Sequence, residues 1–389
     1  HHDRASAADP ERRHQGAAAA DIFLCHWRPA ALPRRGLDFD TMHRAHPHLI
    51  YCHLSGFGSR GPMAELPGYE HVVAAYSGRM QLFAGLTDRP GPVFSAVQVG
   101  IHASAQSAVA GILAAVLERG ESGPGRLLET SLLQGMLPYE MGAMLGQQLA
   151  QHVPDLQAAF GAPSTEPPLP TLYYHPAQAG DGRWMQFGNL LPHLFDNFLI
   201  NTDLIDVVAD ADFDPKQLLI RDKNKQEACR ERMLKRILDR PADVWMQQFI
   251  EDGGVVSGIY QTTQDALSDP DIVANGHVIE RADGAQLGPL ARMSRTPAQP
   301  GAAAAPGSQL ADDWAATPRA AAPRTSEALP LAGVKIIELA TIIAAPIGAS
   351  FLADMGAEVI KVEQIGGDPF RGMLSGLGSA RVNAGKHSI

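Results

Sequence analysis

Cysteine is scarce in this sequence. It holds three, Cys25, Cys52 and Cys229, and no two of them form a CxxC pair. Disulfide frameworks and cysteine-based zinc sites need several cysteines at short, regular spacings, so the sequence argues against both. Two of the three lie in apolar, strand-like runs. This placement predicts buried small hydrophobic side chains and suits a reducing, cytoplasmic compartment.

Motifs for metal ligation and serine chemistry are missing as well. The chain contains no HExxH and no GxSxG, which argues against a zinc protease or a serine hydrolase. The histidine-rich spots, His1–His2 and His46 with His48, lack ligand spacing on a helix, and HPH in a turn predicts exposed imidazoles. We therefore expect no metal site. We also expect no dinucleotide fingerprint, so NAD binding is not supported.

Long apolar runs and an excess of basic charge are lacking too. The longest apolar stretch, near Ala103–Leu117, is interrupted by Ser104, Gln106 and Ser107, and it is too short and too polar to span a bilayer. The first residues are polar and charged, unlike a signal peptide. The net charge is −10, which does not suit a nucleic-acid-binding surface. We expect neither a membrane nor a nucleic acid as a partner.

The chain does contain strand–turn–helix–strand patterns. The apolar runs Ile22–Leu24 and Leu49–Tyr51 are short and nearly continuous, as in parallel strands buried on both faces. Ala105–Arg119 has a helical pattern and is ended by the breakers in GESGPG, after which a strand leads into another apolar helix. These patterns predict an α/β, Rossmann-like large domain over residues 1–165.

The character of the sequence changes after the proline-rich connector Gly161–Pro170. LYYHPAQAGDGRWMQFGN predicts a hairpin of two aromatic-rich strands around Gly180–Gly182, and amphipathic helices follow. We interpret residues 166–298 as a smaller α+β domain with a return segment. Residues 299–328 are dominated by Ala, Pro, Gly and Ser, which predicts a flexible linker.

Residues 329–389 look like the beginning of a domain. LPLAGVKIIELATIIAAPIGASFLADMGAEVIKVEQIGGDPFRG predicts strand, loop, helix, strand, which is how a nucleotide- or coenzyme-binding α/β domain usually opens. Near the other end, ADIFLCHW is a strand with no predicted partner before it. We infer a window on a longer protein, or a tandem or permuted chain.

Several of these segments resemble family III CoA transferases. This group, also called the CaiB/BaiF family, includes formyl-CoA and carnitine CoA-transferases and α-methylacyl-CoA racemases. ADIFLCHWRPAALPRRGLDFDTMHRAHPHLIYCHLSGFGSRGP, GILAAVLERGESGPGR and DGRWMQFG are similar to family segments in the family's order. The turn at Asp269–Pro270 and the segment Arg292–Ala298 resemble the family's small domain and return strand. Residues 329–389 resemble its opening segment, which in the family normally precedes the strand that ADIFLCHW resembles.

That order implies one domain without its front, then a linker, then a second front. The resemblance therefore favours the middle of a fused protein with two family III halves, with circular permutation as the alternative. It implies the family III fold, a Rossmann-like large domain with a smaller α+β domain. Family members form interlocked dimers, so we expect a homodimer or an intramolecular pseudo-dimer.

The resemblance also implies a covalent mechanism. In the family, an Asp attacks the acyl-CoA thioester to give a mixed anhydride, and free CoA thiolate then moves on and off that acyl group. This Asp lies ten positions before the Gly of GILAAL; counting back from Gly111 reaches Ile101, with His102 after it. An aliphatic side chain thus occupies the nucleophile position. The acid is then supplied by a second half, or another group such as Glu70 has taken over in a different reaction.

The family places a Tyr-Glu or His-Asp pair after its GFGxxGP loop, and Tyr69–Glu70 occupies that place. In the transferases the pair lies near the thioester; in the racemases the His acts as acid and base. Tyr69 makes racemase chemistry unfavourable, because a phenol titrates near pH 10. The alternative is that both residues merely start a helix, with Glu70 favourable in its first turn.

Coenzyme contacts are implied at two places. The family's NFRPG loop corresponds to His26, Trp27, Arg28 and the following Arg34; the arginines suit phosphate oxygens and the indole suits adenine. The alternative is a solvated basic turn, and His26 replaces the usual Asn. The family's first coenzyme-contact loop corresponds to Thr341–Pro346, with main-chain contacts at Ile342 and Ile343.

The function that these matches imply is transfer of CoA between an acyl-CoA and a carboxylic acid. No tightly bound cofactor is expected, since the coenzyme is a substrate. Two other classes stay open: a non-catalytic CoA-binding or scaffold half, and an isomerase or racemase of acyl-CoA esters. The acyl group is set by loops and is not predicted.

Overall fold

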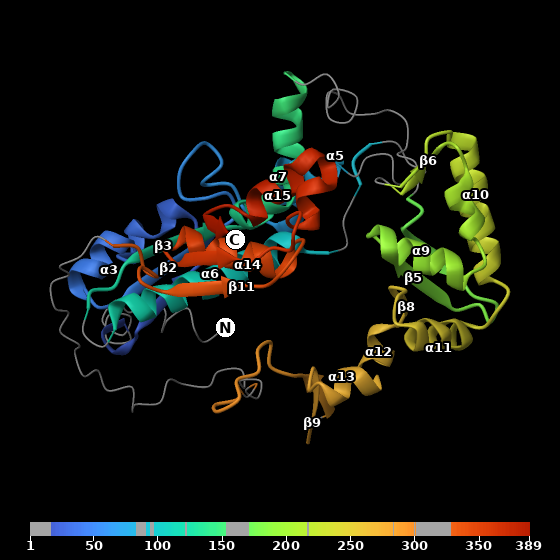
Figure 1. The fold of residues 1–389 in the computed structure, drawn as a ribbon. Coiled ribbons are helices and arrows are strands. Elements are labelled where there is room, and N and C mark those ends of the chain that lie inside the picture. The colour runs from blue at the N-terminus through green and yellow to red at the C-terminus, as the bar shows by residue number, and fades with distance from the viewer. Residues whose placement is uncertain are drawn as a thin grey trace. The chain divides into compact units, whose positions relative to one another are not determined.

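The structure is a computed structural model, and it describes residues 17–82, 91–93, 97–120, 123–152, 171–215, 218–282, 284–298, 300 and 328–389. These residues fall in two compact units. The first joins residues 17–152 to residues 328–389, and the second holds residues 171–300. Figure 1 draws both, with the elements labelled as they are named below. The proline-rich connector and most of the predicted linker lie outside the described residues.

The first unit contains a parallel sheet in the order β1-β2-β3. Its strands are β1 (Ile22–Cys25), β2 (Ile50–Ser55) and β3 (Leu127–Ser131). The predicted parallel α/β arrangement is confirmed. Burial on both faces holds for β2, where five of the six residues are buried, but it is wrong for β1. β1 is an edge strand, and its Leu24 is 61% exposed.

Helices connect these strands. They are η1 (Pro29–Ala31), η2 (Pro33–Arg35), α3 (Phe39–Ala45), α4 (Glu70–Tyr76), α5 (Arg79–Leu82), α6 (Val99–Arg119) and α7 (Leu132–Ala150). The helix predicted to end at Arg119 is confirmed as α6, which begins earlier, at Val99. Gly120 stops it at φ 58°, a backbone angle that glycine adopts without a Cβ clash. Ser131 starts α7, its hydroxyl accepting a hydrogen bond from the N–H of Gln134.

The prediction that the stretch near Ala103–Leu117 is too short and too polar to span a bilayer is wrong by length and composition. Among the described helices, α6 alone is long and apolar enough to cross a membrane, with a mean hydropathy of 1.5. Core helices of soluble proteins share that property. A third of this segment is buried within the chain, and Ala108, Ala114 and Ala115 form much of that buried side.

The prediction that His46 and His48 are exposed is wrong. Both imidazoles are buried, at 9% and 5% exposure, because the turn that carries them packs beneath the end of α6. There Arg119 donates from Nη1 to the carbonyl of His48 at 3.1 Å and pairs with Asp21 at 2.7 Å. His48 Nε2 donates to the carbonyl oxygen of Ala20 at 3.1 Å, which satisfies the buried ring.

Residues 328–389 form the predicted strand, loop, helix and strand, with a third strand added. The elements are β11 (Lys335–Glu338), α14 (Ala344–Asp354), β12 (Glu358–Lys361), η4 (Pro369–Gly376), α15 (Leu377–Val382) and β13 (Lys386–Ser388). The three strands form a second parallel sheet, β11-β12-β13. Ala114 of α6 packs with Leu331 and Ala357, and Figure 1 shows this orange and red part beside α6 and α7. Its assignment to a second copy stays a prediction.

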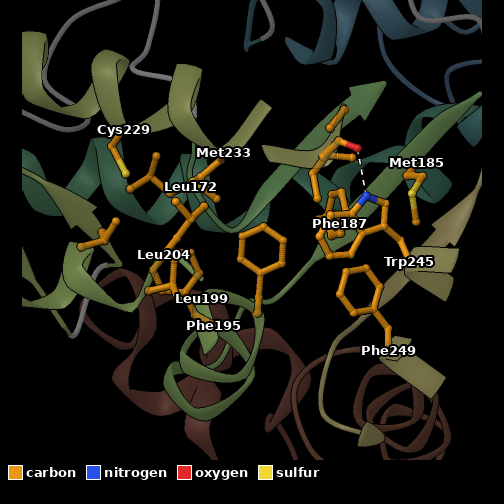
Figure 2. Close-up of a cluster of buried hydrophobic side chains, with 14 of the residues drawn as sticks. Leu172, Met185, Phe187, Phe195, Leu199, Leu204, Cys229, Met233, Trp245 and Phe249 are labelled. Carbon is orange, nitrogen blue, oxygen red and sulfur yellow. Dashed lines mark hydrogen bonds between the residues drawn. The ribbon is translucent and has the colours of Figure 1, made fainter. Parts of the chain in front are cut away.

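The second unit contains the predicted hairpin and helices. Its elements are β4 (Tyr174–Gln178), β5 (Trp184–Gly188), α9 (Pro192–Asn201), η3 (Ile205–Ala209), β6 (Phe213–Asp214), β7 (Leu219–Ile220), α10 (Lys223–Ile237), α11 (Ala242–Asp252), β8 (Ser257–Ile259), α12 (Thr263–Ala266), α13 (Pro270–Ala274), β9 (Val278–Arg281) and β10 (Gly284–Leu287). β4, β5 and β8 form an antiparallel sheet, and helices supply the rest of its core. Figure 2 shows Phe187, Trp245 and Phe249 in this core. Trp245 satisfies its buried N–H by donating to the carbonyl of Ile237 at 2.9 Å.

Candidate ligand-binding site

A cavity of about 740 Å³ lies in the first unit, where the carboxyl ends of β1 and β2 meet the start of α6. This is the edge at which parallel α/β sheets bind their ligands. Five candidate residues singled out from the sequence are among those that line it: His26, Trp27, Arg28, Tyr69 and Ile101. Arg35 also lines the cavity and was not singled out. Segments far apart in the chain therefore meet at one site.

The indole of Trp27 and the guanidinium of Arg35 form one wall of the cavity. The Arg35 guanidinium carbon lies 5.0 Å from the centre of the Trp27 ring, a cation–π contact, and Trp27 keeps 41% exposure. Arg34 is not among the described residues that line the cavity. The short helix η2 turns the neighbouring Arg35 toward it instead, so the sequence analysis missed this residue.

A buried histidine holds the main chain of this wall. His53 of β2 donates from Nε2 to the carbonyl oxygen of Trp27 at 2.7 Å, and it is 4% exposed. Its Nδ1 lies 4.0 Å from Oε1 of Glu129 on β3. Since a carbonyl can only accept, the ring must carry its proton on Nε2. A side chain of β2 thus holds the loop after β1 that carries the indole.

Arg28 extends the cationic side of the cavity. Its Nη1 donates to the carbonyl oxygen of Glu65 at 3.3 Å, while the Glu65 carboxylate accepts from the N–H of Ala30 at 2.7 Å. These bonds tie the loop after β1 to the turn before α4. The remaining guanidinium nitrogens of Arg28 have the planar geometry that suits phosphate oxygens.

Tyr69 and Glu70 are adjacent but have different surroundings. Tyr69 is the N-cap residue of α4, lines the cavity and is 74% exposed. Glu70 is 6% exposed, and both of its carboxylate oxygens accept main-chain hydrogen bonds at 2.8 Å, from Gly100 and Ile101 at the start of α6. A carboxylate is favourable at this positive helix end. The geometry therefore favours a structural role for Glu70, stabilising the first turn of α6.

Ile101 lies in the first turn of α6 and lines the cavity with 41% exposure. Its place at the mouth of the helix is where the resemblance puts a nucleophilic Asp. The described residues that line the cavity include no Asp or Glu. Leu54, Leu66 and Leu132 add further apolar surface. This site can hold an anionic ligand with an apolar arm, but its own lining provides no carboxylate nucleophile.

Ile342 and Ile343 are not among the residues lining that cavity; they lie in the loop between β11 and α14. Ile342 has φ 68°, in the left-handed region that β-branched residues avoid. Its N–H donates to Oδ1 of Asp368 at 3.2 Å. Ile343 is 47% exposed and precedes α14 without a side-chain cap.

Four buried charges surround this loop. Lys361 Nζ lies 2.7 Å from Glu338 Oε1 and 2.9 Å from Asp368 Oδ2, and Lys386 Nζ lies 2.6 Å from Glu338 Oε2. Each side chain is 4% exposed or less. Burial alone lowers the pKa of Lys361, but its bonds to Glu338 and Asp368 outweigh burial and raise it. The two cations and two anions compensate one another.

Neither Asp368 nor Lys361 was singled out from the sequence. A signal was present: Glu338 and Lys361 each follow two apolar residues at the end of a short strand, and a charge that becomes buried there needs a partner. The segment Gly56–Gly61 was also missed, since GFGSRG does have GxGxxG spacing. It opens no helix, because α4 begins only at Glu70. The conclusion on NAD is unchanged.

Two of the three thiols, those of Cys52 and Cys229, are buried as expected, whereas Cys25 is only half-buried. Burial raises the pKa of both Cys52 and Cys229 to about 11. All three cysteines are free, and the described residues hold no group of three or more His, Cys, Asp or Glu side chains that could bind a metal ion.

The sequence profile of CoA-transferase family III matches residues 5–309 and 331–389, most of the chain. The chain belongs to this family. It is 26% identical over 262 residues to succinyl-CoA–D-citramalate CoA-transferase of Chloroflexus aurantiacus, covering 67% of this chain and 61% of that protein. It is also 26% identical over 269 residues to cinnamoyl-CoA:phenyllactate CoA-transferase of Clostridium sporogenes, covering 68% and 62%. The chain thus spans about three fifths of the length of these curated relatives.

Solved structures confirm the predicted fold. A CaiB/BaiF family protein from Brucella suis aligns with a TM-score of 0.57 at 21% identity, over 74% of this chain and 72% of that one. A hypothetical protein from Mycobacterium tuberculosis aligns with a TM-score of 0.58 at 21% identity, over 74% of each chain. The family and the α/β fold expected from the resemblance are both confirmed.

Proposed function

We propose that this chain is the CoA-binding part of a family III CoA-transferase, and that the complete protein moves CoA between an acyl-CoA thioester and a carboxylic acid. One observation carries the proposal. The cavity of about 740 Å³ combines an exposed indole, two guanidinium groups and an apolar wall at the start of α6. Coenzyme A has the matching chemistry: an aromatic base, phosphates and a long, largely apolar arm that ends in a thiol.

The lining residues divide this ligand between them. Arg28 and Arg35 pair with phosphate oxygens, because the planar guanidinium group can donate two parallel hydrogen bonds to a phosphate. Trp27 stacks on the adenine ring while His53 holds its main chain. The apolar residues around Ile101 face the thioester arm. The loop at Ile342 and Ile343 contacts the coenzyme through its main chain, as the family resemblance implies.

The transfer reaction needs a nucleophile that this cavity lacks. A carboxylate oxygen attacks the thioester carbonyl carbon, the carbon–sulfur bond breaks, and CoA leaves as the thiolate. Ile101 has no oxygen to offer. We infer that the carboxylate comes from a second family III half, paired with this one as a pseudo-dimer within a longer chain or in a homodimer of that chain, and we propose that the protein is cytoplasmic. CoA enters as a substrate, not as a tightly bound cofactor.

The position of Ile101 specifically favours a second candidate, a CoA-binding half with no catalysis of its own. The two differ in whether a complementary half completes the site. A racemase is less favourable, because Tyr69 stands where the racemases have His. The relatives' names include succinyl-CoA, cinnamoyl-CoA, D-citramalate and phenyllactate, so the proposed substrates are an acyl-CoA and a carboxylic acid.

Calorimetric titration of the 389-residue chain with CoA tests the binding site. Trp27→Ala and Arg35→Ala should each weaken binding about tenfold, the cost of one stacking or charge-assisted contact. Arg34→Ala is the matched control and should leave the affinity unchanged, because Arg34 lies outside the cavity lining. No measurable CoA binding, or equal losses at Arg34 and Arg35, would overturn the proposed site.

A further inference from the structure

The buried carboxylate of Asp368 touches the loop at its most strained residue. Asp368 is 2% exposed, and its Oδ1 accepts the N–H of Ile342 at 3.2 Å and that of Phe370 at 2.9 Å. Oδ2 faces Lys361 at 2.9 Å. Ile342 has φ 68°, a backbone angle that is unfavourable for an L residue with a branched Cβ. An unfavourable backbone conformation persists only where its surroundings hold it.

The same charge network grips the loop at both ends. Lys361 Nζ donates to the carbonyl of Ala340 at 2.6 Å, and Lys386 Nζ donates to that of Pro346 at 2.7 Å. With the Asp368 bond in the middle, three charged side chains fix the main chain from 340 to 346. Ile343, beside the strained residue, stays 47% exposed. Strain held in this way, next to an exposed residue, is typical of ligand-contact segments.

We propose that Asp368 is a positioning residue for coenzyme binding, which it controls by holding Ile342 in the left-handed conformation. This inference rests on the proposed function, in which the 340–346 loop contacts CoA. Asp368 touches no ligand itself. It acts through its hydrogen bond to the Ile342 N–H. The buried charge network therefore holds the loop in its binding conformation before the coenzyme binds.

The substitution Asp368→Asn tests the bond. Its amide has one oxygen, which turns toward the Lys361 ammonium because a cation can only donate. The NH₂ group then opposes two N–H donors, and the hold on Ile342 is lost. Asn should weaken CoA binding about tenfold, the equilibrium value of one bond to a charged acceptor. Glu358→Gln, which alters an exposed carboxylate on β12, is the matched control and should change nothing.

Glycine rescue separates positioning from general damage. Gly adopts positive φ freely, so D368N/I342G should recover an affinity within about threefold of wild type. D368N/I343G should not recover, because Ile343 has φ −125° and needs no such freedom. Equal rescue by both glycines, or by neither, would overturn the proposal. If D368N does not fold, Ile342→Pro replaces it: it removes the N–H and fixes φ near −65° while leaving the charges intact. An I342P chain that binds CoA like wild type would also overturn it.

Hydrogen–deuterium exchange at the Ile342 amide keeps the two proposals apart. D368N should speed this exchange about tenfold and E358Q should not, whether or not CoA binds. If wild type fails to bind CoA while D368N still exchanges the Ile342 amide faster, the proposed function is refuted. The contact between Asp368 and Ile342 would then still be supported. Unchanged exchange in a folded D368N chain would refute the hold itself.

Discussion

Oε2 of Glu70 accepts a hydrogen bond of 2.8 Å from the main-chain N–H of Ile101, across thirty-one residues of sequence. Oε1 accepts another from Gly100, also at 2.8 Å. Gln98, the N-cap residue of α6, makes no side-chain capping bond, so Glu70 does that work from a different helix. With both oxygens used, Glu70 is poorly suited to replace the missing nucleophile.

Glu70→Gln should destabilise the first unit by about 1–3 kcal/mol, because the amide nitrogen must face an N–H donor at a buried site. Urea unfolding at pH 7 measures this loss. Tyr69→Phe is the matched control: the phenol beside it is 74% exposed, and its loss should change stability by less than about 0.5 kcal/mol. Equal effects of the two variants would contradict the assigned role of Glu70.

Lys361→Met should cost about 3–5 kcal/mol, because it leaves the Asp368 carboxylate buried without its cation. Lys335→Met provides the comparison on the same sheet. Lys335 is 77% exposed and lies 3.8 Å from Glu358, a surface pair worth less than about 1 kcal/mol. Thermal unfolding of both variants checks the difference, and a small loss for K361M would mean that the four charges do not stabilise the fold.

The second unit should lose stability in mild acid because of His175. Its ring is buried against Phe187 and Phe198, and this burial lowers the pKa of His175 from 6.5 to about 4. The unfolded chain therefore takes up a proton below pH 6.5 that the folded unit refuses until about pH 4. This contribution to the free energy of unfolding is fully present above pH 6.5 and should fall by about 3 kcal/mol between pH 6.5 and about pH 4.

Unfolding of the second unit, followed by urea titration from pH 7 to pH 4, measures this slope. His175→Phe keeps the ring stacking and removes the proton site, so its stability should be flatter with pH. His193→Gln, at an exposed position on α9, should retain the wild-type slope. A His175→Phe chain with the unchanged slope would assign the acid sensitivity to other groups.

The sequence predicted the elements of the fold because they depend on local pattern. The parallel runs at β1 and β2, α6 with its Gly120 stop, and the hairpin at Gly180–Gly182 all follow from periodicity and turn residues. Exposure was harder to predict. His46 and His48 were expected at the surface, and only the long-range packing of Arg119 against their turn buries them.

The candidate site was predictable where it lies close in sequence and not where it needs long-range partners. Trp27 and Arg28 follow directly from the loop after β1. Arg35 and Arg34 are adjacent, and only the turn of η2 decides which one lines the cavity. The bond from Asp368 to Ile342 joins two turns twenty-six residues apart, and no local pattern encodes it.

We propose that this chain binds CoA and that a carboxylate at residue 101 is the one group it lacks for attack on the thioester. The direct test is mass spectrometry of the full chain incubated with acetyl-CoA, with hydroxylamine used to trap any acyl anhydride. Wild type should remain unmodified, Ile101→Asp should give a trapped adduct, and Ala105→Asp, one turn further along the same lined face of α6, should give none. An adduct on the wild-type chain, or none on an I101D chain that still binds CoA, would contradict the account.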